Sequence, residues 1–147
     1  MKEPISHDTV ELLKECSSGI RMGVRSIQDV EGRIQSGDMR RQLAACREKH
    51  ERLGERADQM LADCGQTPTA PDPMARGMAW LKTNVRMAAE LSDKTAADLL
   101  TDGCNMGAKS LTRYLNEYGG ADRQARALAH ELIALEEKTA EDLRAYL

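Results

Sequence analysis

The sequence of 147 residues contains no phenylalanine, and its other aromatic residues are one tryptophan and three tyrosines. β-Branched and aromatic residues, which favour strands, never alternate with polar residues over a useful length. Leu, Ala and Met supply most of the apolar content, and these residues favour helices. The sequence therefore predicts an all-α fold, and its length fits a single domain spanning residues 1–147.

Long apolar runs are also missing. No stretch approaches the roughly 18 apolar residues that a membrane-spanning helix needs. Residues 1–4 lead into polar sequence rather than into an apolar signal-peptide region. We therefore expect no membrane partner and a cytoplasmic location of the bacterial type. The four cysteines include no Cys-x-x-Cys pair, and we interpret them as reduced, small core residues.

Neither half of the chain has an excess of one charge sign. Residues 1–73 carry 11 Lys and Arg against 13 Asp and Glu, and residues 74–147 carry 10 against 11. This balance does not indicate nucleic-acid binding. No glycine-rich phosphate loop, nucleophile elbow or dinucleotide motif occurs either. The sequence thus favours a non-enzymatic protein and identifies no small-molecule substrate.

Proline is scarce, and three of the four prolines lie within six residues, at Pro68, Pro71 and Pro73. On both sides of this cluster, apolar residues recur at spacings of three and four. The pattern predicts long helices at about residues 8–35, 38–64, 93–118 and 121–147, a linker at 65–73 and a short amphipathic helix at 74–90. Such a link can return along a bundle, so we expect a hairpin, a crossover and a second hairpin. The alternative is a plain up-down bundle with a flexible linker.

Polar residues mark where these helices begin. We expect Asp8 or Thr9 to cap the first helix, residues 36–38 to cap the second, and Ser92 or Asp93 to cap the helix after the crossover.

With these features the chain resembles the ferritin-like superfamily, and more narrowly the small, mostly uncharacterised bacterial ferritin-like domains, some of them associated with stress responses. The residues that carry the resemblance are 74–82 (MARGMAWLK), 93–100 and 102–107 (DGCNMG). It covers nearly the whole chain. The resemblance implies a four-helix bundle with a crossover, and a role in interaction or stress as a homodimer or with a protein partner.

Di-iron members of the ferritin-like group use a Glu from each of two helices and a Glu-x-x-His from each of the other two. Arg47 precedes His50 by three residues and Ala127 precedes His130, so neither histidine completes the motif. His7 lies at the N-terminus. The apolar seams of the first and third long helices show no Glu at mid-height. We therefore expect no ferroxidase centre.

His50 lies on the apolar seam near the middle of its helix, with Cys46 one turn before it. If the second and third long helices run parallel, Cys104 lies at a similar height. Zinc prefers thiolate and imidazole ligands, so Cys46, His50 and Cys104 are a candidate Zn or Fe site. The alternative is a core histidine hydrogen-bonded to a neighbour such as Ser17 or Tyr114, beside cysteines that act as small hydrophobic residues.

The sequence leaves the roles of two further groups of residues open. The acidic run of the last helix is interpreted as its solvated face; it comprises Glu131, Glu136, Glu137, Glu141 and Asp142. For four methionines of the crossover and the following helix there are three alternatives: they fill the core, they line a pocket, or they form a partner surface. These methionines are Met74, Met78, Met87 and Met106.

Overall fold

The structure is a computed structural model and describes residues 6–67 and 91–147. Within these ranges the chain forms four α-helices, followed by a short 3-10 helix, and no strand; the elements are α1 (His7–Glu31), α2 (Gly37–Asp63), α4 (Asp93–Glu117), α5 (Arg123–Leu143) and η2 (Arg144–Tyr146). The predicted all-α four-helix bundle is confirmed. The crossover helix predicted at 74–90 and the proline cluster lie outside the described residues.

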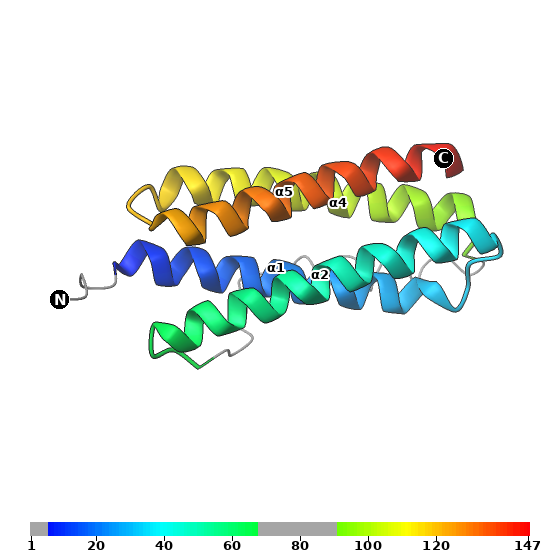
Figure 1. Cartoon of the computed structure of the whole chain (residues 1–147). Coiled ribbons are helices and arrows are strands. Elements are labelled where there is room, and N and C mark those ends of the chain that lie inside the picture. Colours follow the sequence, from blue (N-terminus) through cyan, green and yellow to red (C-terminus); the bar gives the residue numbers. More distant parts are fainter. Residues whose placement is uncertain (1–5, 68–90) are drawn as a thin grey trace.

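The order of the helices in space matches the predicted crossover topology. Figure 1 shows α1 and α2 as one antiparallel hairpin and α4 and α5 as the other, with α2 and α4 running in the same direction. A plain up-down bundle would instead place α4 antiparallel to α2. The most extensive helix contacts lie within each hairpin, and α1 and α2 both also contact α5. In the described part of the chain, no helix is long and apolar enough to cross a membrane.

Each long helix begins at a side chain that accepts a hydrogen bond from the backbone N–H three residues later; the caps are Ser6, Ser36, Ser92 and Asp122. Such caps satisfy a backbone donor that the first helical turn leaves free. The expected caps of α2 and α4 are confirmed. The expected cap of α1 was wrong, because Ser6 accepts from the Thr9 N–H at 3.1 Å.

Two aspartates fasten the hairpins to each other. The Asp93 carboxylate, in the first turn of α4, accepts from the backbone N–H groups of Gln35 at 2.7 Å and Ser36 at 2.8 Å. At the opposite end of the bundle, the Asp8 carboxylate in α1 accepts from the Gly120 N–H at 2.8 Å. Each hairpin loop is thus held by the first turn of a helix from the other hairpin, which fixes the height of the hairpins relative to each other.

The hydrophobic core consists of two clusters at opposite ends of the bundle. The first apolar cluster is built around Leu12, Leu13, Leu61, Leu128 and Leu132. The second apolar cluster is built around Val30, Met39, Leu43, Leu100 and Leu143. Burying one such side chain stabilises the fold by about 1.5–3 kcal/mol. Between the two clusters, at mid-height, the core becomes polar.

Candidate functional site

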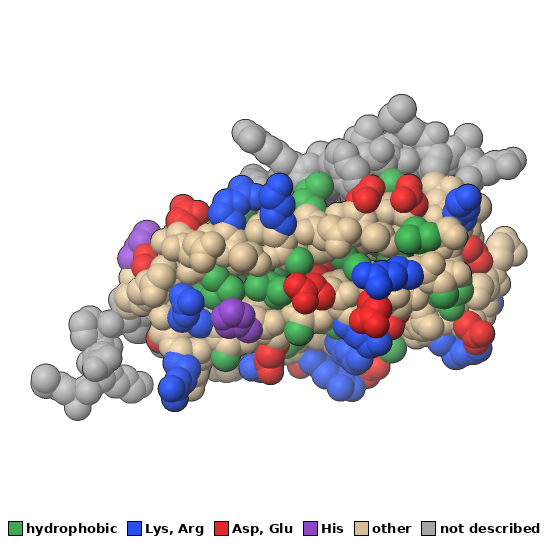
Figure 2. Space-filling view, turned by 90° about the horizontal axis from the view of Figure 1, so that it is seen from above, with side chains coloured by type: hydrophobic (Ala, Val, Ile, Leu, Met, Phe, Trp, Pro, Cys, Tyr) green, Lys and Arg blue, Asp and Glu red, His purple; other side chains and the backbone are tan. Residues whose placement is uncertain are grey.

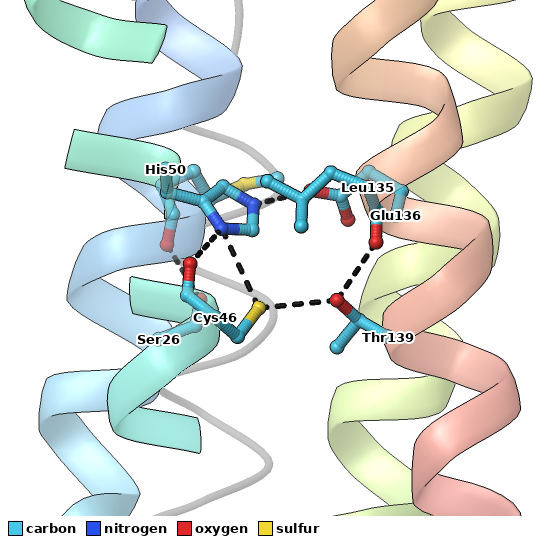
Figure 3. A network of polar contacts seen from close by, with 7 residues as sticks. Ser26, Cys46, His50, Leu135, Glu136 and Thr139 are labelled. Carbon is cyan, nitrogen blue, oxygen red and sulfur yellow. Dashed lines mark hydrogen bonds and ion pairs between the residues drawn. The ribbon is translucent and has the colours of Figure 1, made fainter. Parts of the chain in front are cut away.

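The polar layer, as we call the core between the two apolar clusters, is formed by Cys46 and His50 of α2, Cys104 of α4, and Glu136 and Thr139 of α5. His50 is the most deeply buried of them, with 2% of its surface exposed. Figure 3 shows His50 and Cys46 pointing from α2 toward Glu136 and Thr139 on α5. The layer therefore joins the two hairpins through the centre of the bundle.

An ion pair between His50 and Glu136 is the main contact of the polar layer. The Nε2 atom of His50 lies 2.5 Å from Oε1 of Glu136, and its Nδ1 atom lies 2.9 Å from the backbone oxygen of Cys46. The carbonyl oxygen accepts from Nδ1, and with the Glu136 side chain as a carboxylate Nε2 donates as well. This geometry describes an imidazolium paired with a carboxylate.

The pKa of His50 agrees with that assignment. Burial works against the charged ring, but the hydrogen bonds to Cys46 and Glu136 and the negative charge of Glu136 outweigh burial, and they raise the pKa of His50 to about 10. Among the contributions that raise this pKa, the hydrogen bond with the Cys46 side chain is the largest, followed by the hydrogen bond and the charge of Glu136. His50 is therefore protonated at neutral pH.

The Cys46 thiol donates to Thr139 and also lies 3.5 Å from Nδ1 of His50. The Thr139 hydroxyl gives its proton to the backbone oxygen of Leu135 at 2.7 Å. The Cys46 Sγ atom lies 3.1 Å from the same hydroxyl oxygen, so the contact requires the thiol proton. Cys46 is thus a thiol whose proton takes part in a hydrogen bond (Figure 3).

Cys104 approaches the layer from α4. Its thiol forms a hydrogen bond with Glu136, and burial, followed by the negative charge of Glu136, raises the pKa of this thiol. A thiol with a raised pKa stays protonated at neutral pH and is a weak nucleophile. Cys104 therefore serves as a second donor to the carboxylate that also holds His50.

Two glycines make room for the ion pair. A Cβ atom at Gly23 of α1 would lie 2.9 Å from the His50 ring, and one at Gly107 of α4 would lie 3.3 Å from Oε2 of Glu136. Both positions thus bring a helix backbone close to a buried side chain, as glycine allows. The helices α1 and α4 carry neither residue of the ion pair, and these two glycines let their backbones pack closely against it.

The sequence-based interpretation of Glu136 was wrong. Glu136 was assigned to the solvated face of α5, yet only 9% of it is exposed. The alternative for His50, a buried histidine hydrogen-bonded to a neighbour, agrees with the structure, but the side-chain partner is Glu136 rather than Ser17 or Tyr114, and Ser17 donates to Asp58. The local pattern did not reveal the pair because its members lie 86 positions apart in sequence.

The structure brings the three predicted metal ligands to one place. Cys46, His50 and Cys104 all line one cavity, together with Glu136. Within residues 6–67 and 91–147, however, no group of three or more His, Cys, Asp or Glu side chains has the arrangement that could hold a metal ion. Metal binding by these residues stays a prediction.

The cavity beside the polar layer has a volume of about 60 Å³ and a mostly apolar lining. Its lining residues on α2 and α5 are buried, whereas several on α1 and α4 are partly exposed, so it opens between α1 and α4. Glu15 of α1 lines it with only 7% of its surface exposed. This buried carboxyl group was not among the sequence candidates, which found no Glu at mid-height of the first helix.

Comparisons with known proteins address the fold. No protein-family model matches the chain, and no curated protein matches it. Among solved structures it is similar to Dps92 from Deinococcus radiodurans, with 11% sequence identity, a TM-score of 0.75, and coverage of 95% of this chain and 86% of that one. The chain therefore has a ferritin-like fold, as the resemblance implied. At this identity the similarity concerns the fold alone.

Proposed function

We propose that this chain is a non-enzymatic ferritin-like bundle without a di-iron ferroxidase centre, which acts by association with a second copy or with another protein. The observation that carries the first part is the closed hydrogen bonding of the polar layer. His50 donates from both ring nitrogens, and the thiols of Cys46 and Cys104 also donate. To ligate a metal, each of the three would have to give up a proton.

The surface supports a role in association. A groove on the outer face of the α1–α2 hairpin has arginines on the α1 side and carboxylates on the α2 side; these are Arg21, Arg25, Glu51, Glu55 and Asp58. A second copy turned by a two-fold axis would place the basic side against the acidic side. On the face shown in Figure 2, basic and acidic side chains are interspersed rather than gathered by sign, which favours a protein partner over a nucleic acid. The resemblance adds the expectation of a stress-related role.

Light scattering after size-exclusion chromatography tests the association. We expect a dimer that Arg25→Glu shifts toward monomer and that Arg25→Glu combined with Glu55→Arg restores. A monomer at all concentrations would contradict self-association and leave a different protein as the partner to be sought.

The second candidate function is metal binding by Cys46, His50 and Cys104, since the structure gathers them at one cavity with Glu136. Elemental analysis of untagged protein separates the two proposals. Less than about one tenth of an equivalent of Zn or Fe would rule out the metal site. About one equivalent, lost in Cys46→Ser and Cys104→Ser, would instead replace the first proposal.

A further inference from the structure

The cavity between α1 and α4 has the size of a small organic group. Its volume is about 60 Å³. A water molecule needs roughly 10–15 Å³ on this measure, so the cavity holds on the order of five heavy atoms. Its mouth is edged by residues with small side chains or none, including Gly19, Gly103 and Ser110, which are partly exposed.

Glu15 gives this cavity a chemical preference. Its Oε2 atom is buried and has no hydrogen-bond partner among the described residues. A buried acceptor without a donor costs about 1–3 kcal/mol, and more when it is charged. The Tyr114 hydroxyl hydrogen-bonds the same carboxyl group, which holds it beside the cavity that both residues line. The free oxygen calls for a donor supplied from outside the chain.

The charges around Glu15 indicate which kind of hydrogen-bond donor this oxygen would bind. Burial raises the pKa of Glu15, and the negative charges of Glu11 and Glu117 raise it further. A positive group at Oε2 would be attracted by all three carboxylates. His50 is the basic residue in the described lining, and its charge is already balanced by Glu136 at the buried side of the cavity.

We propose that the cavity binds a small primary ammonium ion with a short apolar chain. The ammonium group donates to Oε2 of Glu15, and its apolar chain lies against the glycine and leucine surface beside Cys104 and Gly107. Binding needs no metal and no change of the His50–Glu136 pair. The site would make the bundle a binding protein for short alkylamines.

Isothermal titration with isopentylamine, at pH 7.5 and low ionic strength, tests the proposal. Isopentanol and isopentanoate have the same carbon chain and serve as the neutral and negative comparisons. We expect the amine to bind at least tenfold more tightly than the alcohol, and the carboxylate not to bind. Chemical-shift changes in ¹⁵N spectra should map to α1 and α4.

Three variants check that the site is this one. Glu15→Gln keeps the shape of the side chain and should weaken amine binding at least tenfold while changing alcohol binding less than twofold. Gly103→Leu should abolish binding of both, because a Cβ atom at Gly103 meets nothing within 4 Å and a longer side chain can enter the cavity. The matched control is Gly32→Ala, which also has open space but lies outside the cavity and should bind as the unmodified chain does.

Equal binding of amine and alcohol, amine binding that survives Glu15→Gln, or no binding by the unmodified chain would each overturn the proposal. If Glu15→Gln fails to fold, as judged by its thermal transition, Gly103→Leu decides: retained amine binding in that variant overturns the proposal equally.

Discussion

The two apolar clusters and the polar layer between them are built on the same four helices but follow different physics. In the clusters, side chains such as Leu12 and Leu128 are completely buried and contribute through the area they remove from water. In the layer, His50 and Glu136 are buried as an ion pair, and such a pair often stabilises no more than apolar residues of the same volume would. Stability therefore comes mainly from the ends of the bundle, and the chemistry lies at its centre.

The largest effect should come from breaking the ion pair on one side. Glu136→Leu leaves His50 without its acceptor, and we expect a loss of about 3–5 kcal/mol in the free energy of unfolding at pH 7. The double variant His50→Leu with Glu136→Leu should recover most of this loss. Urea denaturation measures both. If the double variant is no more stable than the single one, the polar layer stabilises the fold by burial, as the apolar clusters do.

The close approach of α1 to the layer gives the next largest effect. Gly23→Ala places a Cβ atom 2.9 Å from the His50 ring, and we expect a loss of about 1–3 kcal/mol from overpacking. Gly32→Ala, which meets nothing within 4 Å, is the control. Thermal denaturation of the two variants compares them, and equal transition temperatures would mean that the ring moves aside freely.

The pH dependence of stability should also separate the layer from the clusters. The pKa of His50 is raised from 6.5 to about 10 on folding, so the folded state holds a proton that the unfolded state releases. Its contribution is complete below about pH 6.5 and is lost as the pH rises toward 10, with a slope of at most about 1.4 kcal/mol per pH unit.

Urea denaturation between pH 6.5 and 9.5 measures this slope. Subtracting the same series for the double leucine variant cancels the titration of Cys16, whose pKa is raised by burial and by Glu15 in both proteins. Burial also raises the pKa of Cys104 in both proteins, but the double variant lacks the contribution of Glu136 to that pKa. A difference that stays constant over this range would contradict a raised pKa for His50.

The smallest effect should come from a helix end, remote from the polar layer. Ser36→Ala removes the side chain that accepts from the Met39 N–H at 3.2 Å, and we expect a loss of about 1 kcal/mol. The pH profile should keep its shape, because this cap does not touch His50. A changed profile in this variant would mean that the layer responds to any loss of stability.

The bundle itself could be predicted because its signals are local. Apolar residues three and four positions apart define the buried stripes, and Ser36 and Ser92 mark where helices begin. The proline cluster suggested the crossover, and the parallel course of α2 and α4 agrees with it (Figure 1). The first helix ends at Glu31 rather than near residue 35, since the chain turns at Gly32 while Ile34 stays buried beyond the helix.

The candidate site could be predicted only in part. Cys46, His50 and Cys104 were found because they interrupt apolar stripes, but Glu136 was missed because a glutamate beside another glutamate usually faces water. The available signal was its spacing: Leu132, Glu136 and Thr139 follow one another at helical intervals, and all three are buried. Glu15, which lies between Lys14 and Cys16, was missed as well. Burial of a carboxyl group depends on partners from other helices, which local spacing does not contain.

The protonation state of His50 tests the central claim, that the middle of the bundle holds a hydrogen-bonded ion pair. Long-range ¹H–¹⁵N spectra of the imidazole rings at pH 7.5 measure it directly, with His7 and His130, both exposed, as references in the same sample. We predict that Nδ1 and Nε2 of His50 both carry a proton. A bare or metal-bound nitrogen on His50 at this pH would contradict the account.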